Sequence, residues 1–196
     1  MTTARLEAFS DGVVAIIITI MVLELKVPHG TSPEALWPLA PVFLSYVLSF
    51  VNVGIYWNNH HHMLHSAQRI DGRVLWANLH LLFWLSLYPF TTAWMDETDL
   101  ARTPLVVYGV NLLAAAVAYY LLQRAIFRTS GGDRLRQAVG RDLKGKVSPL
   151  IYVAGILLAF VEPYLAVACY VAVAVLWLVP DRRVERFVAA AADGEA

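Results

Sequence analysis

The sequence has few charged residues and almost no cysteine. Only 15% of its 196 residues are Asp, Glu, Lys or Arg, whereas 59% are hydrophobic and the mean hydropathy is +0.58. Because soluble domains carry roughly 25% charged residues, this composition argues against a soluble enzyme. The 15 basic residues are balanced by 15 acidic ones, so the positive excess typical of nucleic-acid binding is missing. The single cysteine, Cys169, excludes an intrachain disulfide and a four-cysteine metal site.

Long uncharged stretches predict membrane spans. A transmembrane helix needs about 20 mostly apolar residues. Three stretches of this length contain no charged side chain, namely 35–57, 74–95 and 103–123. The longer segment 147–180 holds one charge, Glu162, directly before Pro163. Because proline disfavours helical geometry in the residue before it, we predict two spans joined by a turn at Glu162.

The N-terminal segment is a less regular span. Residues 6–25 are largely apolar, but Glu7, Ser10 and Asp11 interrupt the first two turns. A signal peptide would begin with basic residues and end at a small-residue cleavage site. Here acidic residues precede the apolar run, and Glu24 and Lys26 follow it. We therefore expect a span that is retained.

These segments predict an all-α integral membrane protein with six transmembrane helices per subunit. The expected spans are about 5–25, 35–62, 73–95, 103–125, 147–162 and 163–180. With this topology 13 of the 15 Lys and Arg residues fall on one side, and only Lys26 and Arg102 lie opposite. Basic loops favour the cytoplasm, so both termini are predicted to be cytoplasmic. Residues 1–188 form a single domain in this interpretation, and residues 189–196 are expected to be a disordered tail.

Polar residues inside spans are costly and are therefore functional candidates. Ser10 and Asp11 lie in the first span, His60–His62 at the end of the second and Asn78 near the start of the third. All lie near the predicted cytoplasmic ends. We predict one buried hydrogen-bond network of Asp11, Ser10, one or two of the histidines and Asn78, which joins the first three spans.

The same cluster allows two sharper hypotheses. Histidines 60–62 and 65, together with Asp11, are suitable metal ligands, but adjacent histidines on a helix point about 100° apart. The sequence also lacks a His-Glu-x-x-His pair. A proton-sensing or proton-carrying role is the other hypothesis, because histidine titrates near neutral pH.

The first span also has an apolar stripe. Gly12, Ile16, Ile20 and Leu23 recur at helical spacing, with Thr19 beside them. By itself such a stripe is typical of a membrane helix that packs against protein or lipid.

The start of this span carries a specific resemblance. The string Arg5–Gly12, RLEAFSDG, resembles the R-x-x-x-F-S-D signature that opens the first helix of the transmembrane protein 175 family of potassium channels. The run Trp57–His61 resembles a second landmark of that family. Asn78, followed by Tyr88–Phe90, resembles a third. The resemblance extends over essentially the whole chain, although the last three spans match only in kind.

The resemblance implies a homotetramer whose pore is lined by the first helix of each subunit, without the Thr-Val-Gly-Tyr-Gly filter loop of ordinary potassium channels. By this resemblance Ile16 matches the narrow hydrophobic constriction, and Ile20 and Leu23 match further apolar rings. Thr19 matches the layer linked to potassium preference. The remaining motif residues would form the polar network between helices: Arg5, Phe9, Ser10, Asp11, His60, His61 and Asn78.

We therefore expect a potassium-preferring cation channel of the bacterial plasma membrane, in which potassium passes near Thr19. No enzymatic activity, cofactor, resident metal or nucleic-acid partner is expected. Acidic residues near the predicted outer ends of the spans would enrich cations there: Glu24, Asp96, Glu97 and Asp99. One alternative is a proton-permeable channel of the same architecture. The other is a metal-dependent intramembrane enzyme that uses Asp11 and His60–His62.

Overall fold

The computed structural model describes residues 2–65, 67, 70–129 and 143–178. The predicted tail at 189–196 lies outside these ranges. All regular structure within them is helical, and the predicted all-α fold is confirmed. The elements are α1 (Thr3–Leu23), the 3-10 helix η1 (Pro33–Leu39), α2 (Ala40–His65), α3 (Gly72–Ser86), α4 (Tyr88–Glu97), α5 (Arg102–Phe127), α7 (Leu143–Leu158) and α8 (Pro163–Leu178).

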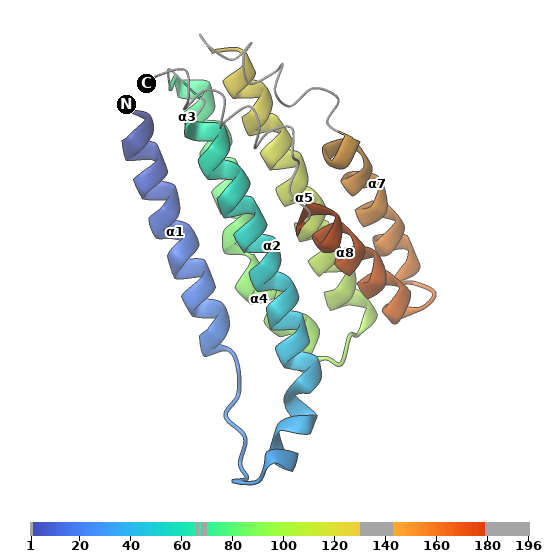
Figure 1. Cartoon of the computed structure of the whole chain (residues 1–196). Coiled ribbons are helices and arrows are strands. Elements are labelled where there is room, and N and C mark those ends of the chain that lie inside the picture. Colours follow the sequence, from blue (N-terminus) through green and yellow to red (C-terminus); the bar gives the residue numbers. More distant parts are fainter. Residues whose placement is uncertain (1, 66, 68–69, 130–142, 179–196) are drawn as a thin grey trace.

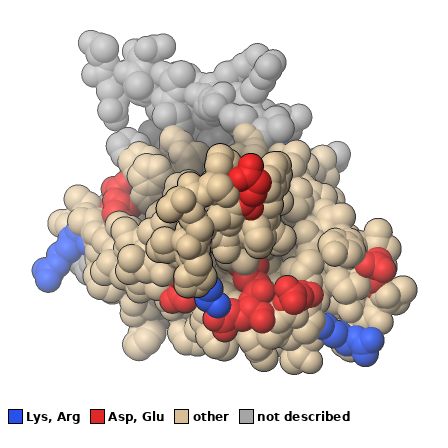
Figure 2. All heavy atoms as spheres, turned by 90° about the horizontal axis from the view of Figure 1, so that it is seen from below, with Lys and Arg blue, Asp and Glu red and all other residues tan. Residues whose placement is uncertain are grey.

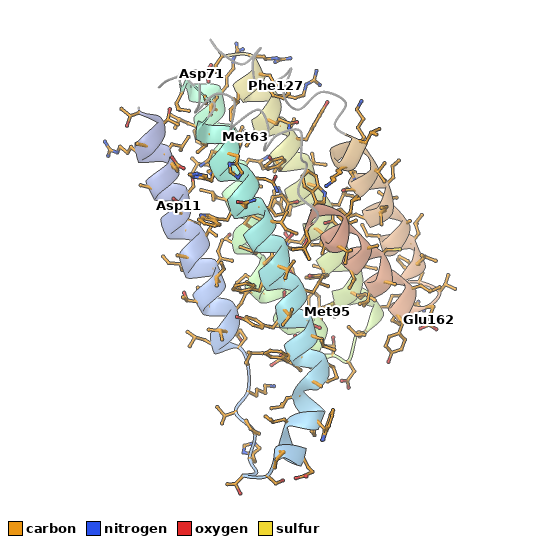
Figure 3. The ribbon with its side chains drawn as sticks, viewed as in Figure 1. Asp11, Met63, Asp71, Met95, Phe127 and Glu162 are labelled. Atoms are coloured by element: carbon orange, nitrogen blue, oxygen red, sulfur yellow. The ribbon has the colours of Figure 1, made fainter. Side chains whose placement is uncertain are left out.

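The helices run up and down in a bundle (Figure 1). α1 packs against α2, α3 and α4, whereas α5 packs mainly against α3 and α7. α7 and α8 form a hairpin, and α2 also contacts α8, so α2 lies between the α1 side and the α8 side of the bundle. Residues Asp71 and Phe127 mark one end of the bundle, and Glu162 lies toward the other (Figure 3).

Three helical segments of the described chain are long and apolar enough to cross a membrane by length and composition. They are Thr3–Leu23, Pro33–Leu64 and Arg102–Phe127, and α8 is a shorter apolar helix. The last two predicted spans correspond to α7 and α8. α7 ends at Leu158 and α8 begins at Pro163, so Glu162 lies in the connecting turn.

The third predicted span, residues 73–95, consists of two helices rather than one. α3 ends at Ser86 and α4 begins at Tyr88. Pro89 has no N–H to donate to the Leu85 carbonyl, and its ring crowds that carbonyl, so a regular helix cannot continue through it. The N–H of Leu87 instead donates to the carbonyl of Trp84 at 3.3 Å.

A tyrosine packs where two glycines leave room. Tyr170 of α8 is fully buried, and its hydroxyl donates to the carbonyl of Leu105 at 3.4 Å. A Cβ atom at Gly109 of α5 would lie 2.1 Å from the Tyr170 hydroxyl oxygen, and one at Gly155 of α7 would lie 2.5 Å from Cε1 of the same ring. Glycine at both positions lets α5, α7 and α8 approach closely.

Candidate pore-lining helix and its polar anchor

One face of α1 is buried inside the subunit. The buried residues recur every three or four positions, as one stripe of an α-helix: Leu6, Ser10, Val14, Ile17 and Met21. They pack against the neighbouring helices α2, α3 and α4. This face attaches α1 to the rest of the subunit.

The opposite face of α1 is not covered by its own subunit. Ile16 is 59% exposed, Ile20 41% and Leu23 79%, and Gly12 and Thr19 are also exposed. These are the residues that the sequence placed on one apolar stripe. A row of large aliphatic side chains on an open face needs a partner surface, a lipid or a narrow pore to shield it from water.

Thr19 presents its oxygen on this uncovered face. Its hydroxyl donates a hydrogen bond to the carbonyl of Ile16 at 2.9 Å. The proton is thereby turned toward the helix backbone. The lone pairs of the hydroxyl oxygen stay free to accept from water or to coordinate a cation.

A chain of buried polar groups links α1, α3 and α2. The side-chain N–H of Asn78 donates to the Ser10 hydroxyl at 2.9 Å, and that hydroxyl donates to the carbonyl of Leu6 at 2.9 Å. Nε2 of His60 lies 2.6 Å from the Asn78 side-chain oxygen. An amide oxygen can only accept, so His60 must donate through Nε2. Ser10, His60 and Asn78 are all buried, so each bond satisfies groups that water cannot reach.

Asp11 does not share this buried chain. The prediction that it joins Ser10, Asn78 and a histidine in one buried network is therefore wrong. Its carboxylate accepts from the indole N–H of Trp57 at 2.9 Å, in a bond that is exposed in the single subunit. Successive residues on a helix are turned by about 100°, so Asp11 lies to one side of the seam that Ser10 faces. Figure 3 shows Asp11 on the α1 side that is turned toward α2.

Two residues that bond α1 to α2 beside the buried chain were not predicted. Trp57 is the donor to Asp11, and Glu7 pairs with Nδ1 of His61. The sequence did contain a signal for Trp57. An indole N–H can donate but not accept, and Trp57 lies within about one helical turn of His60 and His61. The signal for Glu7 was its spacing, one turn before Asp11 on the same side of the helix.

Arg5 and Phe9 lie apart from these bonds. Both are exposed, Phe9 to 51%, and neither has a hydrogen bond with another described side chain. Ser10, His60 and Asn78 are thus brought together, Asp11 and His61 are bonded beside them, and the first two motif positions face outward. Within the described ranges no group of three His, Cys, Asp or Glu side chains is placed to hold a metal ion.

The end of the bundle that carries Glu162 is acidic (Figure 2). Glu24, Asp96 and Glu97 line a hollow there together with Lys26. The Lys26 ammonium lies 3.3 Å from Oε1 of Glu97. This surface brings together three of the four carboxylates that the sequence suggested for attracting cations.

Similarity to known proteins agrees with the motif. A family described as "Endosomal/lysosomal potassium channel TMEM175" matches residues 5–89. A potassium channel of Chryseobacterium sp. (strain P1-3) is 51% identical over 95% of this chain and 97% of its own length. The chain belongs to the TMEM175 family. The resemblance inferred from Arg5–Gly12 is thereby confirmed, and the family consists of ion channels rather than enzymes.

Two further relatives place the chain within the family. The crystal structure of a lysosomal potassium-selective channel TMEM175 homolog from Chamaesiphon minutus is 30% identical. It superposes with a TM-score of 0.77, over 90% of this chain and 96% of that one. The endosomal/lysosomal proton channel TMEM175 of Gallus gallus is 40% identical over 31% of this chain and 15% of its own length.

Proposed function

We propose that the protein is a potassium-preferring cation channel whose pore is lined by α1 from four identical subunits. The observation that carries this proposal is the uncovered apolar face of α1 in a TMEM175-family chain, with Ile16 59% exposed. The buried chain Ser10–Asn78–His60 supports it, because the chain fixes the rotation of α1 from the opposite face.

The pore would be closed by a ring of apolar side chains that excludes water. Four copies of Ile16, with Ile20 and Leu23 in further rings, would line a passage too apolar to hold a continuous column of water at small radius. Such a gate needs no charged plug. A small rotation or outward shift of α1 would widen the passage and let it fill with water.

Potassium preference would come from oxygen atoms without fixed charge. Four Thr19 hydroxyl oxygens would replace part of the hydration shell of a cation, and a neutral ring would release the ion again. The hydrogen bond from Thr19 to the Ile16 carbonyl supports this role, because it turns lone pairs rather than the proton outward.

The orientation follows from charge. Basic residues dominate the side predicted to be cytoplasmic, so both termini would face the cytoplasm of a bacterium whose plasma membrane holds the channel. The acidic hollow lined by Glu24, Asp96 and Glu97 would then lie outside and raise the local cation concentration.

Flux from liposomes tests the proposal. Purified protein is reconstituted, and flux is measured under separate potassium, sodium and proton gradients, with protein-free vesicles as control. The proposal predicts potassium flux above sodium flux. Equal flux of both ions would contradict the preference, and no flux of either from assembled protein would contradict the channel. The molecular mass of the detergent-solubilised oligomer, compared with that of one subunit, tests whether four subunits assemble.

A proton-permeable channel of the same architecture is the second candidate. It is favoured by the proton-channel names of the animal relatives and by His60, a titratable group within the buried chain. The two functions differ in reversal potential. Under a pH gradient with symmetrical potassium, a potassium channel reverses near zero, whereas a proton channel follows the proton gradient.

A further inference from the structure

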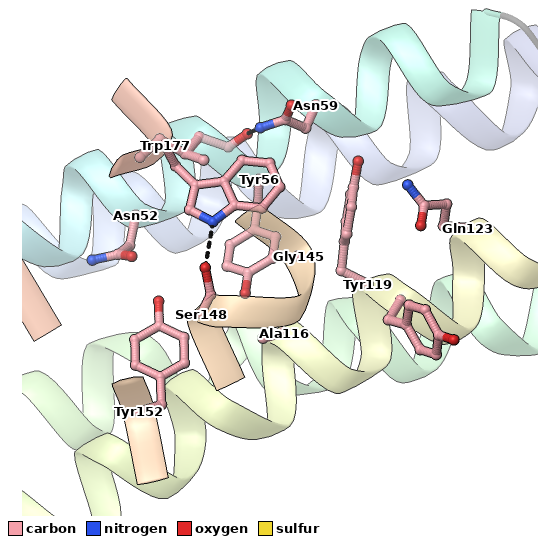
Figure 4. A pocket seen from close by; sticks show the side chains of 12 residues that line it. Asn52, Tyr56, Asn59, Ala116, Tyr119, Gln123, Gly145, Ser148, Tyr152 and Trp177 are labelled. Atoms are coloured by element: carbon pink, nitrogen blue, oxygen red, sulfur yellow. Dashed lines mark hydrogen bonds between the residues drawn. The ribbon is translucent and has the colours of Figure 1, made fainter. Parts of the chain in front are cut away.

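A pocket lies on the side of α2 that faces α5, α7 and α8 (Figure 4). The space between its side chains, counted together with the open solvent at its mouth, is about 540 Å³. Four α2 residues line it at helical spacing: Asn52, Ile55, Tyr56 and Asn59. The pocket is therefore built into one face of α2 and does not belong to the uncovered face of α1.

The described residues of the lining are aromatic, aliphatic, polar or small, and none of them is charged. Five rings contribute, from Tyr56, Tyr119, Tyr120, Tyr152 and Trp177. Aromatic rings supply large apolar contact surfaces of fixed shape. Such walls, with a few polar groups that fix orientation, are typical of small-molecule sites.

Several polar groups of the pocket have capacity left for a ligand. Gln123 is 7% exposed, and its side-chain amide has no hydrogen-bond partner among the described residues. Asn52 and Asn59 each donate through the side-chain N–H to the carbonyl one turn back on α2, which leaves their amide oxygens as acceptors. By contrast, the Trp177 indole donates to Ser148 at 2.8 Å and is satisfied.

This combination selects a class of ligand. The Gln123 amide has no partner among the described residues, so a ligand that pairs with it gains a hydrogen bond inside a partly closed site. The acceptors favour a ligand with an N–H or O–H donor, and the rings favour a flat apolar body. Among the described lining residues there is no carboxylate to neutralise a cation, so a neutral ligand is favoured.

The pocket is coupled to the pore helix through α2. Tyr56 and Asn59 line the pocket, and their neighbours Trp57 and His60 make the bonds to Asp11 and Asn78 that hold α1. A ligand seated against one face of α2 would thus act on a helix whose other face anchors α1. Coupling of this kind requires only that the ligand favour one position of α2.

We propose that this pocket binds a small, neutral aromatic molecule with a hydrogen-bond donor, and that occupancy holds α2 in place and lowers ion flux. The binding part stands by itself. The effect on flux rests on the proposed channel function.

Indole serves as the probe, because it is flat, neutral and carries one N–H. Benzyltrimethylammonium is the cationic comparison. Saturating indole should raise the melting temperature of the detergent-solubilised protein by about 3 °C. It should also lower potassium flux from liposomes about twofold. Benzyltrimethylammonium should do neither.

Two variants test the location, and one is a matched control. Gln123→Leu removes the unpartnered amide, and Tyr152→Phe removes a hydroxyl from the pocket wall. Both should weaken the indole response at least about tenfold, because each deletes a polar group in a desolvated site. Tyr164→Phe makes the same chemical change on α8 at a residue that is 73% exposed and does not line the pocket, and its indole response should be that of the wild type.

The outcomes separate the claims. A saturable melting shift that Gln123→Leu and Tyr152→Phe leave unchanged would overturn the site, as would a stronger response to the cation. The absence of any saturable shift with indole would overturn the ligand class. A shift without a change in flux would overturn the coupling alone. If the protein conducts no ions at all, the channel proposal fails while the melting data still decide the site.

Discussion

α1 and α5 are both long apolar helices with nearly equal mean hydropathy, yet the subunit packs them differently. α5 buries 11 residues, whereas α1 buries five and leaves Ile16 and Leu23 exposed. Hydropathy measures composition, so it cannot separate a helix enclosed by its own subunit from one that keeps a face for a pore or a partner. The positions of small and polar residues make that difference.

α5 is enclosed because small residues let its neighbours come close. Gly109, Ala115 and Ala118 are buried, and Tyr170 fills the space beside Gly109. α1 lacks such a contact on its outer face, where branched aliphatic side chains stand apart. It is attached through polar bonds on one side instead.

The largest effect is expected from breaking the close packing of α5. Gly109→Val would place Cβ 2.1 Å from the hydroxyl oxygen of the buried Tyr170, which is a steric overlap, and should destabilise the subunit by about 3 kcal/mol or more. The matched control is Gly54→Val on α2, where a Cβ meets nothing within 4 Å and the change should cost less than about 1 kcal/mol. Thermal unfolding in detergent measures both. Equal stability of the two variants would contradict the account of α5.

The polar anchor of α1 comes next. Asn78→Leu would leave Nε2–H of His60 without an acceptor in a buried site, at a cost of about 1–3 kcal/mol. Asp11→Asn should cost less, because an amide oxygen can still accept from Trp57 in an exposed bond. Thermal stability of the solubilised oligomer ranks the two. A larger loss of thermal stability in Asp11→Asn than in Asn78→Leu would show that the bond from Trp57 to Asp11 holds α1 more strongly than the buried chain does.

Two adjacent residues distinguish the faces of α1. Ile16→Asn should raise resting potassium flux about tenfold if the uncovered face lines a dry constriction, since amides hold water there. Ile17→Asn makes the same change at a residue that is 3% exposed, and it should reduce assembly without raising flux. Flux is normalised to the amount of assembled oligomer. Well-assembled Ile16→Asn protein without added leak would exclude α1 as the gate.

The smallest effect is expected at Thr19. Thr19→Val keeps the shape of the side chain and removes only its oxygen, so conduction should persist while the potassium-to-sodium permeability ratio falls about threefold. Bi-ionic reversal potentials measure the ratio. Ser86→Ala, which removes an exposed hydroxyl on α3, is the control and should leave the ratio unchanged. An unaltered ratio in Thr19→Val would assign selectivity to another layer.

Much of this architecture could be predicted from local sequence. Uncharged runs indicated the helices, and Glu162 before Pro163 indicated the turn between the last two, because proline acts on its immediate neighbours. The string Arg5–Gly12 was sufficient to indicate the family. The break between α3 and α4 was missed, although Pro89 was visible, because proline can also kink a continuous span.

The sequence by itself determined that the chain is a helical membrane protein of the TMEM175 family, since apolar length and a local motif carry that information. Only the tertiary structure decided that Asp11 meets Trp57 rather than His60, and that a pocket opens behind α2. Which of two neighbouring side chains reaches a given partner depends on the rotation of each helix about its axis. That rotation is set by packing between segments far apart in the chain, and no local pattern contains it.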